Sequence, residues 1–96
     1  MKNYEIMFIV RPTQEEANIK AVAENMKNVL ENQGAKITSF KEMGQRELAY
    51  EVKKYLTGYY FLINIESENS KAIEEFDRLA LISEDIIRHL IIKLED

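Results

Sequence analysis

The stretch that decides the fold is residues 59–65, Tyr-Tyr-Phe-Leu-Ile-Asn-Ile, which directly follows Gly58. Aromatic and β-branched residues dominate it, as is typical of a β-strand. Because successive side chains of a strand point to opposite faces, the odd-numbered residues share one face. We therefore predict a central strand here, with Phe61 and Ile63 in the core.

A second central strand is predicted over residues 3–10, which are again β-branched and aromatic. Arg11 and Pro12 stop this strand, since proline cannot donate a backbone hydrogen bond to a sheet. Both of its faces are mostly apolar. One face is expected to carry Tyr4, Ile6, Phe8 and Val10, and the other Glu5, Met7 and Ile9.

Apolar residues at helical spacing predict two amphipathic helices. The first is expected to begin at Thr13, with Glu16 as its capping-box partner, and to end at Gly34 as a C-terminal cap. The second follows the potential caps of residues 67–70 and ends at residues 83–85. Their core-facing residues are predicted to be Ile19, Val22, Met26, Val29 and Leu30 in the first helix, and Ile73, Phe76, Leu79 and Ala80 in the second.

The two remaining strands differ in character. Residues 36–50 carry many charges and are interrupted at Met43-Gly44, a pattern that predicts a protected edge strand with a bulge. A turn or loop is expected from Glu51 to Thr57. Residues 86–93 form a last, mostly apolar strand, and the sequence leaves open which of its faces meets the core.

The resulting order, βαββαβ, predicts an α+β fold of the ferredoxin-like type in a single domain over residues 1–96. Right-handed crossovers then place both helices on one face of a four-stranded antiparallel sheet, with the expected strand order four, one, three, two. The other face is left bare. Met7, Ile9, Tyr60 and Leu62 are expected there, either as a contact surface or as an ordinary half-exposed face.

Composition excludes several kinds of function. There is no cysteine, so disulfides, thiolate catalysis and cysteine metal sites are excluded, and a single histidine, His89, excludes a multi-histidine site. The 13 basic and 17 acidic residues give a net charge of −4, which argues against a generic nucleic-acid coat. We find no nucleophile–base pair and no phosphate loop, and we expect neither enzymatic activity nor a cofactor. Without a signal peptide or an apolar run of ~20 residues, the expected location is the cytosol.

One segment indicates a protein family far more specifically than the composition does. Residues 44–53, Gly-Gln-Arg-Glu-Leu-Ala-Tyr-Glu-Val-Lys, resemble the signature of the bacterial small (30S) ribosomal subunit protein six family. Val52 stands where isoleucine is usual. The likeness extends over the whole chain, through residues 4–12, 32–35, 75–80 and 83–90.

The resemblance implies a ferredoxin-like structural protein of the cytoplasmic ribosome, with no enzymatic activity and no cofactor. Members of the family bind 16S ribosomal RNA together with ribosomal protein eighteen, as a heterodimer. A membrane or a small-molecule substrate is not implied. Many members carry two basic residues in a row after the signature glycine, whereas Arg46 is followed here by Glu47, which weakens the local positive charge.

Residues for RNA and partner contacts follow from this resemblance together with the expected strands. Arg46 is the first choice for RNA, although charged residues on an edge strand also discourage aggregation. An acidic protein can hold RNA through a few placed cations while a basic partner neutralises most phosphates. The candidate RNA contacts are Lys2, Tyr4, Arg46, Arg88, His89 and Lys93, and the candidate partner contacts are Lys41, Glu42, Tyr50, Tyr60 and Leu62.

Two alternatives from other classes remain open. A regulatory or ligand-sensing module that dimerises through its sheets would be favoured by a pocket with convergent polar groups. A single-stranded RNA binder of the recognition-motif type is suggested weakly by residues 58–63. Exposure of Tyr59 and Phe61 would favour that binder, and their burial would eliminate it.

Overall fold

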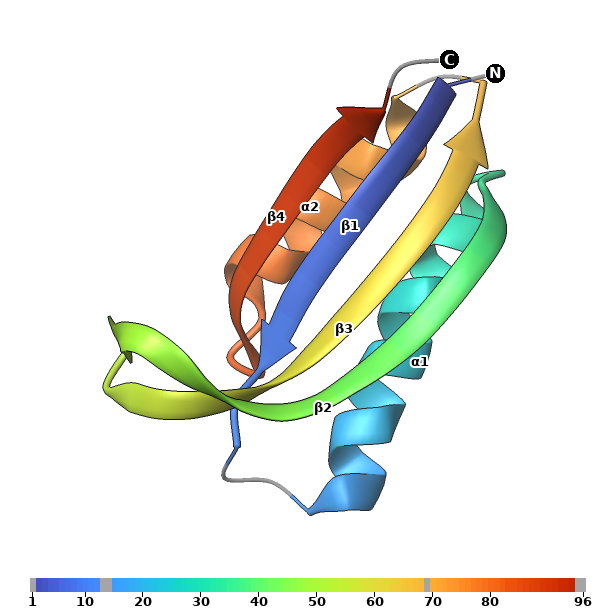
Figure 1. The fold of residues 1–96 in the computed structure, drawn as a ribbon. Helices are drawn as coiled ribbons and strands as arrows, with labels where there is room; N and C mark the ends of the chain where they lie inside the picture. The colour runs from blue at the N-terminus through green and yellow to red at the C-terminus, as the bar shows by residue number, and fades with distance from the viewer. Residues whose placement is uncertain (1, 13–14, 69, 95–96) are drawn as a thin grey trace.

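The computed structural model describes residues 2–12, 15–68 and 70–94, and it has the predicted βαββαβ order. The four strands form one antiparallel sheet in the order β2-β3-β1-β4, as expected (Figure 1). Both helices lie on the same side of this sheet. The elements are β1 (Lys2–Val10), α1 (Glu16–Asn32), β2 (Lys36–Val52), β3 (Tyr55–Ser67), α2 (Lys71–Ile82) and β4 (Ile86–Leu94).

The core lies between the sheet and the helix layer, and the predicted faces of the two central strands are confirmed. Phe8 on β1 is paired with Phe61 on β3, and their rings stack with centroids 5.2 Å apart. Phe76 of α2 meets Phe8 edge-on at 5.8 Å. Aromatic pairs of this kind add stability beyond the burial of their area. The fully buried large side chains are Phe8, Phe76, Ile6, Ile19, Leu30, Ile63, Ile65, Ile86 and Val10.

Helix α1 ends as predicted and begins later than predicted. Gly34 has a left-handed φ of +90° and donates its N–H to Glu31, while the N–H of Ala35 reaches Leu30. These two bonds form the Schellman motif that satisfies the last carbonyls of a helix. At the other end, Glu15 is extended and its carbonyl accepts the first helical hydrogen bonds, so the helix starts at Glu16. The predicted cap, Thr13, lies outside the described residues.

The expected loop from Glu51 to Thr57 is wrong, because β2 and β3 continue as a hairpin to a two-residue turn. Lys53 and Lys54 form this turn with φ values of 49° and 72°. Left-handed residues at both turn positions match the twist of the strands they join. Lysines are unusual in such a turn, which is why the composition pointed to a loop. We call residues 47–57 the arm; it extends beyond the helix-covered part of the sheet (Figure 1).

Strand β2 carries the bulge that was predicted for an edge. Its register with β3 shifts between Glu42 and Gly44, and Gly44 has a φ of +83°. A second irregularity lies between Ile37 and Ser39. Bulges and charges together make a strand edge a poor template for pairing with another chain.

Candidate protein and nucleic-acid interface

The face of the sheet turned away from the helices, here called the open face, presents rows of side chains that cross all four strands. In one row the register places Lys41, Leu62, Met7 and Leu90 side by side, from β2 through β3 and β1 to β4. The row nearer the arm contains Gly44, Tyr60, Ile9 and Arg88. Cross-strand neighbours on one face contact each other directly. The open face therefore combines an apolar centre with cations at both edges.

The register settles the faces of β4 that the sequence left open. Leu90 is paired with Met7 and Ile92 with Glu5, so both lie on the open face. They are 49% and 43% exposed, unusually high for apolar residues within a sheet. Sequence reasoning missed both residues. The signal that would have found them is the pairing with β1, whose own faces were predicted correctly.

The cations of the open face have no carboxylate partners. Within the described part of the chain, neither Lys41 nor Arg46 nor Arg88 takes part in an ion pair. By contrast, Lys20 and Lys27 on α1 are paired with glutamates of the same helix, at 3.5 and 3.8 Å. Positive charge that is free to meet an anion is thus found on the sheet rather than on α1.

The arm is fixed over the end of the sheet by contacts with β4, with β1 and with Arg11, which follows β1. Nearer the tip of the arm, the guanidinium of Arg88 on β4 donates a hydrogen bond to the Tyr50 hydroxyl. At its base, Gly58 lies against Ile9, and a Cβ on Gly58 would come within 2.3 Å of the Ile9 Cγ2 atom. The pKa of Arg11 is raised by its hydrogen bond with the Tyr55 side chain, and further by the Asp85 carboxylate. The Arg11–Asp85 ion pair measures 3.0 Å.

Comparison with known proteins decides which family has this arrangement. A family model described as ribosomal protein S6 matches residues 3–93. The chain belongs to the ribosomal protein S6 family. A solved structure, the 30S ribosomal protein S6 from Thermotoga maritima, superimposes with a TM-score of 0.92 at 29% sequence identity. The match covers 97% of this chain and 87% of the other.

Membership of the S6 family confirms the resemblance seen in residues 44–53 and the ferredoxin-like fold. It makes the chain a small-subunit ribosomal protein, and the family is a structural, non-enzymatic one. Neither described helix combines the length and the apolar character that a membrane-crossing helix needs. Residues 2–12, 15–68 and 70–94 contain no cluster of three or more histidine or carboxylate side chains that could hold a metal ion.

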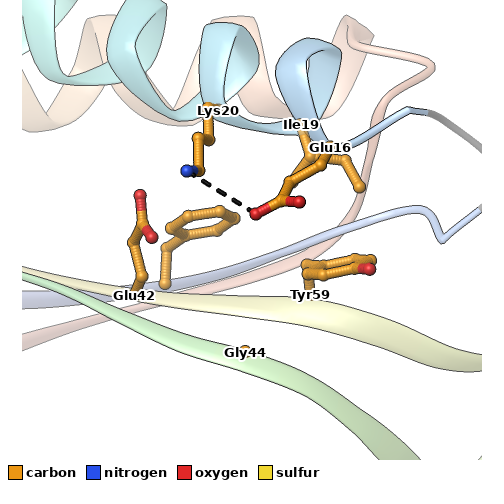
Figure 2. Close-up of a pocket in the computed structure, with 7 residues that line it drawn as sticks. Glu16, Ile19, Lys20, Glu42, Gly44 and Tyr59 are labelled. Atoms are coloured by element: carbon orange, nitrogen blue, oxygen red, sulfur yellow. Dashed lines mark ion pairs between the residues drawn. The ribbon is translucent and has the colours of Figure 1, made fainter.

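In this S6-family member, Glu42 does not lie on the open face. It is paired with Phe61, so its side chain points to the helix layer, toward α1 (Figure 2). There it lines a cavity of about 100 Å³ together with Glu16, Lys20 and Tyr59. Lys41 and Glu42 are consecutive residues of β2, so strand alternation places them on opposite faces and only Lys41 can lie on the open face. Ligand pockets usually measure ~300–1,000 Å³, so this cavity is too small to be one. Two more open hollows measure about 400 Å³, beside Leu48 and Leu56 of the arm, and about 380 Å³, beside Val29 and Leu79 of the helices.

Tyr4 and His89, two of the expected RNA contacts, lie inside the protein on the helix side of the sheet. Tyr4 is only 6% exposed in the core, where it cannot stack on a base. His89 is paired with Phe8 on the helix side, and its Nε2 atom lies 2.7 Å from an Asp77 carboxylate oxygen. Its ring also packs against Phe76. Both side chains are engaged within the protein, so we leave them out of the proposed RNA-binding set.

The remaining cations fall into two groups at opposite ends of the sheet. Arg46 is paired with Gly58 at the base of the arm, and Arg88 lies close by on β4. Lys2 is paired with Ser67 and Lys93 with Tyr4, so both lysines are exposed at the far end of the sheet and lie on its helix side. The structure therefore brings Arg46, Arg88 and Tyr50 into one region and separates them from the other two lysines.

The RNA recognition-motif alternative required Tyr59 and Phe61 to be exposed, and they are not. Phe61 is 3% exposed, and Tyr59 is half-buried on the helix-covered face. In a recognition motif these positions would present aromatic rings to stacked bases. Here the same residues hold the helix layer on the sheet.

Proposed function

We propose that this chain binds 16S ribosomal RNA together with ribosomal protein eighteen, as a structural and non-enzymatic part of the small ribosomal subunit. The match of residues 3–93 to the S6 family supports the ribosomal role. The main observation in support of binding to both RNA and protein eighteen is the composition of the open face. There, exposed apolar side chains lie between unpaired cations, as a joint protein and RNA surface requires.

The apolar centre of the open face suits a protein partner. Leu90 and Ile92 are about half-exposed and stand beside the half-buried Met7 and Leu62. Contiguous exposed apolar patches on soluble proteins usually mark interaction sites. Tyr60 adds an aromatic ring to the next row, a residue type that is enriched at protein interfaces. Lys41 is exposed at the β2 end of the first row, where it would lie at the rim of the contact.

The cations around this centre suit RNA phosphates. Arg46 on β2 and Arg88 on β4 are exposed and belong to the same end of the sheet. Arginine offers planar donors that match phosphate oxygens. With a net charge of −4, the chain alone would bind RNA weakly, because each phosphate contact gains affinity through counterion release. A basic partner seated on the open face would supply the missing positive charge. Lys2 and Lys93, at the far end and on the helix side of the sheet, are secondary candidates that lie outside the open face.

The test is a titration of a labelled 16S ribosomal RNA fragment with the purified chain, with and without protein eighteen. We expect weak binding alone and clearly tighter binding with the partner at physiological salt. Since coupling is reciprocal, the RNA must tighten the protein pair by the same factor. Tight binding that does not depend on the partner, or no binding in either case, would contradict the proposal.

A matched pair of variants locates the partner surface. Leu90→Gln changes an exposed leucine on the open face, and Leu81→Gln changes an exposed leucine on α2. We expect the first to weaken the complex with protein eighteen and the second to leave it unchanged. Equal effects of the two variants would argue against docking on the open face.

A further inference from the structure

We propose that the Lys53–Lys54 turn at the tip of the arm is a phosphate-contact site for the RNA backbone. The proposal rests on the RNA-binding function proposed above and adds a site to it. Neither lysine was among the candidates drawn from the sequence. The arguments come from their backbone conformation, their free charges and the way in which the arm is held.

The backbone conformation of the turn favours residues other than lysine. Lys53 and Lys54 have φ values of 49° and 72°, a left-handed conformation that L-residues with long side chains rarely adopt. Asn-Gly is the pair that such two-residue turns favour. Strained backbone positions of this kind are found where the side chain serves a function. Two consecutive lysines therefore suggest that their ammonium groups matter more than the ease of the turn.

The charges of the turn are also free. Both lysines are exposed, and in the described part of the chain neither one forms an ion pair or a side-chain hydrogen bond. Lys20 and Lys27, in contrast, are neutralised within α1. On an acidic protein, two adjacent unpaired ammonium groups form a local site for an anion.

The arm presents these groups at a defined place. Tyr50 is held by Arg88, Tyr55 by Arg11, and the base of the arm is packed through Gly58. With these contacts, the arm carries the Lys53–Lys54 turn past the ends of the central strands (Figure 1). A preorganised site loses less entropy on binding than a flexible one.

Phosphates fit this tip better than protein carboxylates do. Lysine ammonium groups are point charges with three rotatable donors, which suit phosphate oxygens along a nucleic-acid backbone. Two adjacent ammonium groups can neutralise successive phosphates of an RNA backbone and release their condensed counterions, a gain that an isolated protein carboxylate does not offer. The two lysines also stand at an exposed tip rather than in a concave site. RNA backbone is thus the ligand that the observations favour.

The test replaces the turn by the pair that its backbone prefers, Lys53→Asn with Lys54→Gly. We expect the melting temperature of the variant to rise, because the left-handed turn is relieved. We expect its affinity for the 16S fragment in the presence of protein eighteen to fall about tenfold. The slope of log affinity against log salt should also decrease by roughly 1.4–1.8, since each of the two lost phosphate contacts contributes roughly 0.7–0.9. The control, Lys20→Gln with Lys27→Gln, makes the same charge change on α1 and should leave RNA affinity within about twofold.

Each outcome decides the proposal. If the unmodified chain binds RNA with its partner and the turn variant keeps the same affinity and salt slope, the turn is not an RNA contact. If the α1 control loses as much affinity, the effect is one of net charge and the site is rejected. If the turn variant binds protein eighteen more weakly in the absence of RNA, the tip binds an acidic protein surface instead. If the unmodified chain binds no RNA at all, the proposed function fails, and this site with it.

Discussion

The Arg88 guanidinium donates a hydrogen bond to the Tyr50 hydroxyl and lies 5.6 Å from the centroid of the Tyr50 ring, across 38 residues of sequence. Tyr50 belongs to β2 and Arg88 to β4, which are the two opposite edges of the sheet. The arm therefore crosses the ends of the two central strands to join these edges. Both residues had been candidates for binding, and the structure shows that they also bind each other.

A double-mutant cycle measures this contact. Tyr50→Ala, Arg88→Ala and the double variant should give a coupling free energy of about 0.5–1 kcal/mol, the range for exposed cation–π pairs. Thermal or denaturant unfolding supplies the values. Tyr50→Phe keeps the ring and should retain part of the coupling. A coupling near zero would mean that the arm is not held by this pair in solution.

Gly58→Ala should destabilise the fold by about 1–3 kcal/mol, as overpacking does. The new Cβ would meet the Ile9 Cγ2 atom at 2.3 Å and the Val10 carbonyl at 3.4 Å. Ile9→Leu removes that methyl branch and should rescue part of the loss, as measured by urea unfolding.

Gly34→Ala is the matched control for the glycine experiment. A Cβ there has no neighbour within 4 Å, but φ is +90°. Its loss of about 1–2 kcal/mol would come from the left-handed backbone alone. Ile9→Leu should not rescue it. Equal rescue of both glycine variants would show that Ile9 acts in some other way.

Phe8→Ala should cost about 3–5 kcal/mol, because it empties the centre of the aromatic cluster with Phe61 and Phe76. Leu56→Ala serves as the control, since Leu56 is 67% exposed on the arm and should change stability by less than about 0.5 kcal/mol. Denaturant unfolding of both variants checks the prediction. A loss below about 1 kcal/mol for Phe8→Ala would contradict the core described above.

Arg46→Ala should leave the free energy of unfolding within about 0.5 kcal/mol of the parent, as expected for an exposed residue without an ion pair. It should nevertheless weaken assembly with RNA and protein eighteen in the titration described above. Arg46→Lys should restore binding only in part, because lysine lacks the planar donors. Unchanged assembly with increased aggregation of the free protein would instead assign Arg46 to edge protection.

Much of the fold could be predicted because local patterns and tertiary contacts agree. The alternation in β1 and β3 placed Phe8 and Phe61 in the core, and Gly34 marked the end of α1. The bulge at Gly44 was visible from the glycine and the surrounding charges. The order of the strands then followed from the rules for crossover connections.

The errors arise where a long-range contact decides the local structure. The faces of β4 depend on its pairing with β1, so Leu90 and His89 could not be assigned from β4 alone. The faces of β2 were not assigned from its sequence, and its pairing with β3 places Glu42 on the side opposite to Lys41. The arm was predicted as a loop because its turn consists of lysines, and its position depends on Arg88, far away in the sequence.

The central place of β1 has a consequence for how the protein acquires its structure. Residues of β1 are synthesised before those of β3 and β4, with which they pair; Asn3 meets Leu94. Only the β2–β3 hairpin can form from neighbouring residues. Chains dominated by such distant pairings fold more slowly than chains rich in local contacts. During translation, both edges of β1 therefore stay unpaired until β3 has been made. The edge that pairs with β4 stays unpaired until that last strand follows.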